Sequence, residues 1–170
     1  LHSYINTYNE YNKILKIRNE YLKLLLTSSI ADKNYLDVIT DKLIEKAIII
    51  YQERKKYLDL VNERIGIIFK NITSSGNLVL KYVTNIDFDS FDSEDIRKKM
   101  KHIYCVNYKK ELNYGMTLYG PHRDDFSFYL DSNELKCFGS QGQQKLAVIA
   151  FKLSEIDIFL SPSYRHIPSS

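Results

Sequence analysis

The sequence predicts an α+β protein, in which an antiparallel, coiled-coil-like helical arm is followed by a small, mostly antiparallel β region and a further helix. Apolar residues recur at intervals of three and four through most of residues 1–72, and side chains alternate over 78–83. The remainder follows the order strand, turn, strand, glycine loop, helix. We therefore divide the chain into an arm at 1–72, a strand and helix completing it at 73–113, and a third part at 114–170.

Two apolar seams define the arm. The polar stretch TSSIADKN separates them, so two helices joined by a short loop should pack antiparallel. Arg18 and Arg54 lie within the seams, and we expect both to serve the structure by pairing with neighbours or extending along the helix surface. The first seam contains Tyr4, Tyr8, Tyr11, Leu15, Leu22 and Leu25, and the second contains Leu36, Leu43, Ala47, Ile50, Tyr57, Val61, Ile65 and Ile68.

The middle part begins with a strand, LVLKYVT, in which Leu78, Leu80 and Tyr82 share one face. A single helix is expected after it, capped by Asp92 or Ser93, with two acids in its first turn and Gly115 beyond its end. The helix carries a basic cluster, for which a solvated helix face is the simpler explanation and contact with nucleic-acid phosphates is the alternative. The cluster consists of Arg97, Lys98, Lys99 and Lys101.

The third part opens with GPHRDD, where Gly120 and Pro121 predict a turn before the strand FSFYL. Taken alone, His122 and the two aspartates that follow Arg123 resemble metal ligands, and Arg123 suits a phosphate. A further acidic or histidine partner at a convincing spacing is lacking, so we do not expect a metal. A second strand, LKCF, then leads to the helix, whose apolar face should pack on a sheet or helix; it consists of Leu146, Ile149, Ala150, Leu153 and Ile156.

The motif GSQGQQK, residues 139–145, begins that helix. A helix start offers free backbone N–H groups and the positive end of the dipole, both suited to phosphate oxygens. Ser140 can cap the helix and donate its hydroxyl, whereas Gly142 either lets a ligand approach the backbone or only makes the turn. The sequence contains no G-x-x-x-x-G-K-[ST] loop, so this motif is not a complete nucleotide site.

Charge, cysteine content and hydropathy limit the cellular environments and ligands that we expect for the protein. A formal net charge of +3 permits contact with a polyanion without requiring it. Cys105 and Cys137 lack the spacing of a metal site and do not suggest a disulfide framework, so a reducing, cytoplasmic setting is expected. We see no leader and no apolar run long enough to cross a membrane, and we expect no membrane association.

The segments GPHRDD and SQGQQKLAVIAFKLSEI, in this order, resemble the RecF family of bacterial DNA replication and repair ATPases, which are related to the ABC and SMC proteins. The arm segments ILKIRNEYLKLL and LDVITDKLIE extend the resemblance over nearly the whole chain. It implies an ATP-dependent DNA-binding protein of recombinational repair and the SOS response. Such a protein acts at junctions of single- and double-stranded DNA, with RecO and RecR, to help load RecA at single-strand gaps.

The resemblance also assigns the loop. ABC-type ATPases hold ATP between two subunits, with the signature loop of one facing the Walker motifs of the other. Ser140, Gln141, Gly142 and Gln143 match that signature loop, which would contact ATP in trans in an ATP-dependent homodimer. His122 and Arg123, and the basic cluster Arg97, Lys98, Lys99 and Lys101, become candidate nucleotide or DNA contacts.

A Walker A loop and the paired acids of a Walker B strand are missing from the sequence. We therefore expect these residues to be the central part of a longer protein that is a weak DNA-dependent ATPase with ATP and Mg²⁺. The chain alone should bind no cofactor and carry no activity. Two alternatives stay open: a coiled-coil module that docks a partner without nucleotide function, and a metal-dependent nuclease using the histidine and aspartates of GPHRDD.

Overall fold

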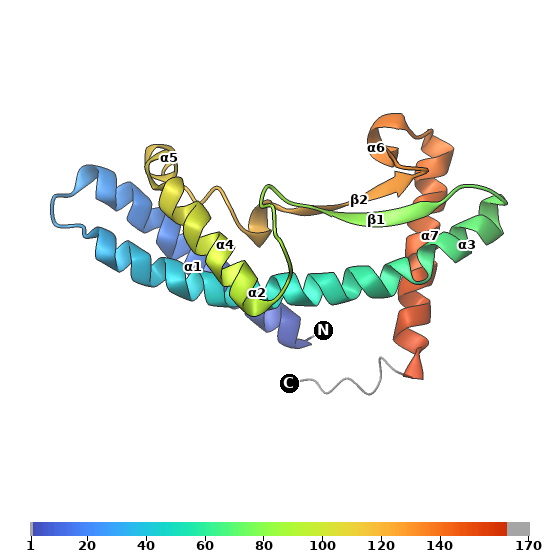
Figure 1. Cartoon of the computed structure of the whole chain (residues 1–170), viewed down its shortest axis with the longest axis horizontal. Helices are drawn as coiled ribbons and strands as arrows, with labels where there is room; N and C mark the ends of the chain where they lie inside the picture. The colour runs from blue at the N-terminus through green and yellow to red at the C-terminus, as the bar shows by residue number, and fades with distance from the viewer. Residues whose placement is uncertain (1, 163–170) are drawn as a thin grey trace. The chain divides into compact units, whose positions relative to one another are not determined.

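The computed structural model describes residues 2–162, which form two compact units (Figure 1). The first unit comprises residues 2–53 and 84–124, and the second comprises residues 54–83 and 125–162. Helix α2 (Lys33–Asn62) contributes to both. These units are defined by contacts in space and not by order along the chain. The division of the chain at residues 72 and 113 therefore stays a prediction.

The first unit confirms the helical hairpin. Helix α1 (His2–Thr27) and the first half of α2 are joined by a short loop. Their predicted seams are buried or half-buried, with Tyr11, Leu22, Leu36 and Leu43 almost fully inaccessible to solvent. This burial of large apolar side chains holds the hairpin, because each contributes about 1.5–3 kcal/mol when removed from water.

The single helix predicted after residue 92 is two helices, α4 (Ser93–Val106) and α5 (Tyr108–Tyr114). The break lies at Asn107, whose φ of −102° and ψ of 10° leave the helical region. Its side chain donates a hydrogen bond to the Ile103 carbonyl at 2.9 Å, which is how asparagine competes with helix propagation. A short 3₁₀ turn, η1 (Pro121–Arg123), ends the unit at the GPHRDD motif.

The second unit contains a three-stranded antiparallel sheet in the order β1-β2-β3, as predicted for the β region. Strand β1 (Leu78–Val83) pairs with β2 (Asp125–Leu130), which places Leu80 opposite Phe128. Strand β3 (Asn133–Glu134) has only two residues, and the predicted strand LKCF is instead the single helical turn α6 (Leu135–Phe138). The Gly139 N–H closes that turn by donating to the Leu135 carbonyl at 2.8 Å.

The long seam predicted for the arm is also divided. Helix α2 ends at Asn62, and α3 (Ile65–Thr73) begins after a two-residue turn. Asn62 accounts for the break, since its side chain donates to the Leu80 carbonyl at 2.8 Å and accepts from the Leu80 N–H at 2.9 Å. The end of α2 is therefore tied to strand β1.

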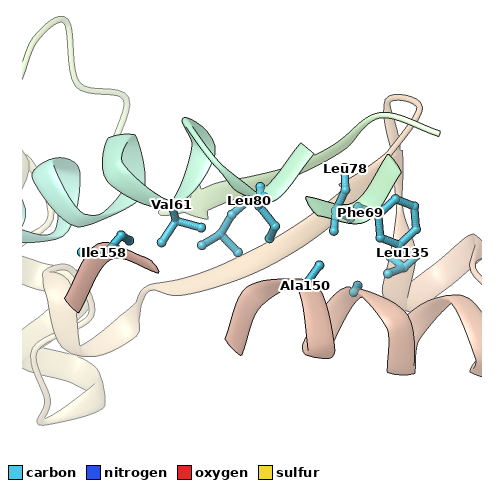
Figure 2. Packing of buried hydrophobic residues seen from close by; sticks show 9 residues of the cluster. Val61, Phe69, Leu78, Leu80, Leu135, Ala150 and Ile158 are labelled. Atoms are coloured by element: carbon cyan, nitrogen blue, oxygen red, sulfur yellow. The ribbon is translucent and has the colours of Figure 1, made fainter. Parts of the chain in front are cut away.

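The core of the second unit lies between α3, the sheet and α7 (Gln141–Leu160) (Figure 2). Helix α7 contributes a narrow face of small residues, Ala147, Ala150 and Ser154, followed by Ile158, and these allow close approach to α3. The prediction for the apolar face of this helix is thus partly wrong. Ala150 is buried and Leu146 half-buried, but Ile149, Leu153 and Ile156 are 46%, 42% and 55% exposed.

Within residues 2–162, none of the helices has the length and apolar character needed to cross a membrane.

Candidate phosphate-binding loop at the start of helix α7

The loop at the start of α7 is a regular helix N-terminus built by Ser140 and Gln143. The Ser140 Oγ accepts a hydrogen bond from the Gln143 N–H at 3.1 Å. In return the Gln143 Oε1 accepts from the Ser140 N–H at 3.0 Å. This capping box satisfies two backbone donors and fixes both side chains. The predicted cap at Ser140 is confirmed.

The capping box still leaves several donors for a ligand. Gln141 and Gly142 occupy the first turn, where no preceding carbonyl of the helix is in position to receive their N–H groups. The Ser140 hydroxyl uses its oxygen as an acceptor and keeps its hydrogen, and the Gln143 amide keeps its NH₂ group. All four residues from Ser140 to Gln143 are exposed. The loop therefore presents donors and the positive end of the helix dipole to solvent, which suits an anion.

The two glycines of the motif have different roles. A Cβ at Gly139 would lie 2.5 Å from the Leu135 side chain and 2.6 Å from the Leu135 carbonyl oxygen, so packing requires glycine there. A Cβ at Gly142 would meet only the Ser140 Oγ, at 3.9 Å, and Gly142 is within the helix rather than in a turn. Neither packing nor backbone conformation accounts for Gly142, although glycine costs a helix up to about 1 kcal/mol relative to alanine.

Gln144 supports the loop through hydrogen bonds from its side-chain amide. Its Nε2 donates to the carbonyls of Leu135 and Gly139, at 3.4 and 3.3 Å, which ties the first turn of α7 to α6. Leu135 is buried in the core of the unit. We did not single out Gln144 from the sequence, because its partners become neighbours only when the residues before the loop form a helical turn.

The first five residues of the GPHRDD motif lie in the first unit, and its histidine has a packing role. His122 Nε2 lies 2.9 Å from the Thr117 carbonyl oxygen, so this nitrogen carries the hydrogen and donates. In the neutral ring Nδ1 then accepts from the Tyr11 hydroxyl, at 2.7 Å. Gly120 makes room for this pair, since a Cβ there would lie 2.4 Å from the Tyr11 hydroxyl oxygen. Arg123 is exposed.

The basic cluster on α4 is largely matched by acids. Arg97 forms ion pairs with Glu45, at 2.7 Å, and with Glu94. Two of the lysines face single acids, Lys99 near Asp89 at 3.9 Å and Lys101 near Asp41 at 4.0 Å. The hydrogen bond from Arg97 lowers the pKa of Glu45 below its ordinary value of 4.5. The net positive charge available for a phosphate backbone is therefore smaller than the sequence of the cluster suggests.

Arg18 forms a buried ion pair with Glu111, a partner that could not be identified from the sequence. Arg18 Nη2 donates to Glu111 Oε1 at 2.9 Å, and the two residues are only 1% and 0% exposed. Two further guanidinium nitrogens, Nε and Nη1, donate to the hydroxyls of Thr40 and Thr117, at 2.9 and 2.8 Å. The guanidinium also lies 4.5 Å from the centre of the Tyr104 ring. The structural role expected for Arg18 is thus filled by a network across the hairpin and α5.

Arg54 also has a structural contact, since its Nη1 donates to the Tyr82 hydroxyl at 3.0 Å within the second unit. Among residues 2–162 no cluster of three or more histidine, cysteine or acidic side chains is arranged to hold a metal ion.

Comparison with known proteins relates the chain to RecF. It is 38% identical over 161 residues to the DNA replication and repair protein RecF of an Exiguobacterium species and 36% identical over 157 residues to RecF of Bacillus subtilis. Each match covers 91% of this chain but 42% of the relative, so the chain spans about two fifths of their length. No family model matches the sequence.

Solved structures give the same relationship. The fold matches a structure of the recombination mediator protein RecF with ATP, from the RecFOR pathway, with a TM-score of 0.86 and 28% identity. That match covers 94% of this chain and 42% of the RecF chain. A second RecF structure, described with ATPrS, matches with the same TM-score and 27% identity.

Proposed function

The chain is homologous to RecF proteins over 91% of its length, and from this premise we propose that it is part of an ATP-dependent DNA replication and repair protein. Its role in that protein is to supply the signature loop, Ser140 to Gln143, to ATP held by a second subunit. Relatives named as DNA replication and repair proteins and a RecF structure with ATP support this proposal.

The observation that carries the proposal is Gly142. The residue stands in the first helical turn, needs no glycine for its own packing or backbone angles, and leaves the adjacent N–H groups uncovered. Glycine adds no side chain beside these donors. An approaching phosphate explains the glycine, because its oxygens must come within about 3 Å of the backbone nitrogens to accept hydrogen bonds.

The arrangement of donors suits the terminal phosphate of ATP. The Ser140 hydroxyl, the first-turn N–H groups and the Gln143 amide are all neutral donors, already fixed by the capping box. They require little reorganisation when the anion arrives, which is the physical basis of electrostatic preorganisation. ATP supplies the negative charge that joins the two subunits, so dimerisation depends on the nucleotide. We assign no Mg²⁺ ligand to residues 2–162, and the ion would accompany ATP in the intact protein.

DNA is the second proposed ligand, with RecO and RecR as partners, RecA loading at single-strand gaps as the outcome and the cytoplasm as the setting. Lys98 is the exposed member of the basic cluster without an acid within 4 Å among the described residues, so it should contribute most of any phosphate contact there. Arg123 is a further candidate because its side chain is exposed.

A partner-docking hairpin without nucleotide function is the second candidate. It is favoured by one observation, the apolar side chain of Ile30, which is 91% exposed in the loop between α1 and α2. Removal of this side chain would weaken partner binding without changing ATP-dependent dimerisation, which separates the two functions. For a metal-dependent nuclease we find no supporting observation.

The test uses a chimera in which this chain replaces the matching segment of Bacillus subtilis RecF. Ser140→Arg places a long cation where the phosphate would bind, and it should abolish ATP-dependent dimerisation, measured by analytical ultracentrifugation. ATP binding to the monomer should be unchanged, because the nucleotide is held by the other motifs. Ser75→Arg, at an exposed serine outside the loop, is the matched control. A Ser140→Arg protein that still dimerises with ATP would disprove the role of the loop.

A further inference from the structure

Helix α5 carries positive charge that the first unit does not neutralise. The helix lies against α1 (Figure 1), and its one acid, Glu111, is buried in the ion pair with Arg18. Lys109 and Lys110 are exposed, and within residues 2–162 no acid pairs with either ammonium group within 4 Å. The exposed charge of α5 is therefore entirely positive.

Two further lysines lie at the ends of α5. Near its start, Lys33 of α2 places its Nζ 5.0 Å from the centre of the Tyr108 ring, and this lysine also pairs with Asp37 at 3.3 Å. Past its end, the side chain of Lys23 of α1 runs beside Gly115, where a Cβ would lie 3.0 Å from the lysine Cγ. The helix between them has seven residues and is about 10 Å long. We call this group the α5 basic surface, which consists of Lys23, Lys33, Lys109 and Lys110.

Tyrosines accompany these lysines. Lys110 Nζ lies 5.9 Å from the centre of the Tyr119 ring, and the Tyr119 hydroxyl donates to Asn107 Oδ1 at 3.2 Å. A ring contact orders an ammonium group without cancelling its charge, whereas a carboxylate would cancel it. Tyr114, the last residue of α5, is 66% exposed. The surface thus combines ordered cations with an aromatic side chain that a ligand can reach.

The basic cluster on α4 differs from this surface. Its Arg97, Lys99 and Lys101 side chains have acidic oxygens at 2.7, 3.9 and 4.0 Å. The two groups of basic residues look alike in the sequence, but the acids that folding brings close lie beside α4. A polyanion gains most from cations that no acid has already matched, because these replace its own counterions. The α5 basic surface is therefore the stronger electrostatic site.

We propose that the α5 basic surface binds single-stranded nucleic acid, with phosphates at the lysines and a base stacked on Tyr114. Single-strand sites combine cations that follow the backbone with aromatic side chains on which bases stack. Both occur here on one short helix and its neighbours. A duplex would bring phosphates but no open base, so Tyr114 would add little to duplex binding. This site rests on the proposed DNA binding for its class of ligand, and the ATP loop takes no part in it.

The first experiment measures binding of the chain to a fluorescent oligothymidine of about 20 nucleotides, longer than a typical single-strand site, by anisotropy. Lys109→Gln/Lys110→Gln removes two charges and should weaken binding about tenfold. It should also reduce the slope of log K against log salt concentration by about 1.4, because each phosphate contact on a single strand contributes about 0.7. Lys98→Gln/Lys99→Gln on α4 removes the same charge and is the matched control, with an expected change below about threefold.

The second experiment tests Tyr114 without changing charge. Tyr114→Leu removes the ring and should weaken oligothymidine binding about fivefold, whereas Tyr114→Phe keeps the ring and should bind like the parent chain. A duplex of the same length should be insensitive to both changes. The series is repeated in the Bacillus subtilis RecF chimera. There the α5 variants should lose single-strand binding and keep ATP-dependent dimerisation.

Three results would overturn the proposal. An equal loss in the α4 control would show that binding follows net charge rather than the α5 basic surface. Oligothymidine binding that Lys109→Gln/Lys110→Gln leaves unchanged in the chain and the chimera would exclude the surface. Polyglutamate that binds as tightly as oligothymidine, with Tyr114→Leu affecting neither, would assign the surface to an acidic protein segment.

Failure of this site can be told apart from failure of the proposed function. A chimera that binds single-stranded DNA independently of α5 would refute this site alone. A chimera that binds neither single-stranded nor duplex DNA would refute the proposed DNA binding and this site with it. The Ser140→Arg test addresses the ATP loop, and its outcome leaves this site unchanged.

Discussion

Gly142 is informative because glycine destabilises the helix in which it stands. Glycine lowers helix stability through its backbone freedom, and here neither a positive φ nor a close neighbour compensates for that cost. Gly139, three residues earlier, is the opposite case, because the side chain and carbonyl of Leu135 exclude a Cβ. The two glycines look equivalent in GSQGQQK, and only their surroundings show that packing requires glycine at Gly139 and not at Gly142.

Replacement of Gly142 by alanine should therefore separate stability from function. In the chain, Gly142→Ala should raise the free energy of unfolding by about 0.5–1 kcal/mol, measured by urea denaturation. In the chimera with Bacillus subtilis RecF, the added methyl group should weaken ATP-dependent dimerisation by tenfold or more. Unchanged dimerisation would show that no phosphate approaches this turn.

At the scale of elements, the first unit is held by contacts between helices that are far apart in sequence. The buried Arg18 and Glu111 pair joins α1 to α5, and the guanidinium also donates to the hydroxyls of Thr40 and Thr117. Thr117 also accepts from His122 through its carbonyl oxygen. The ion pair and the GPHRDD turn thus share a residue, so a disturbance of the pair should reach the turn.

Loss of one partner of this pair should be costly. Glu111→Gln leaves the Arg18 charge buried without its carboxylate, and we expect the free energy of unfolding to fall by about 3–5 kcal/mol. The control is Asp59→Asn, which removes an exposed ion pair with Lys55 and should cost less than about 0.5 kcal/mol. Urea denaturation of the chain measures both. A loss below about 1 kcal/mol for Glu111→Gln would contradict the network.

The ion pair between α2 and α4 predicts a pH dependence. Because Arg97 holds the pKa of Glu45 below 4.5 in the folded chain, the stabilising contribution is complete above that value. It is lost as the pH falls through the lower pKa of the folded state. Arg97→Met should therefore lower the Tm at neutral pH and lose this effect at strongly acidic pH, as followed by circular dichroism. An equal loss of Tm at all pH values would point to packing instead.

At the scale of the whole molecule, the chain holds one half of a proposed nucleotide site. The proposed signature loop offers neutral donors, but the sequence has neither the Walker A lysine that reaches the terminal phosphates nor the paired acids of a Walker B strand. These residues supply charge compensation in phosphoryl transfer, and neutral donors alone do not replace them. The proposed site would therefore be complete only where another part of the protein supplies the other half.

The chain by itself should consequently hydrolyse no ATP. A coupled phosphate-release assay on the purified chain should give no turnover above a buffer blank, with or without duplex DNA containing a single-strand gap. The chimera with Bacillus subtilis RecF serves as the positive control. Turnover by the chain that persists through successive purification steps and is lost in Ser140→Arg would refute the division of the site.

The sequence by itself determined the helical hairpin, the antiparallel strands β1 and β2 and the cap at Ser140, because periodicity, alternation and capping are properties of neighbours along the chain. The tertiary structure decided the partner of Arg18, the two bonds of His122 and the face of α7 that is buried. These depend on residues that folding brings together. For α7 the physical reason is specific: small side chains allow closer helix packing than large ones, so hydrophobicity alone indicated a face that is only partly buried.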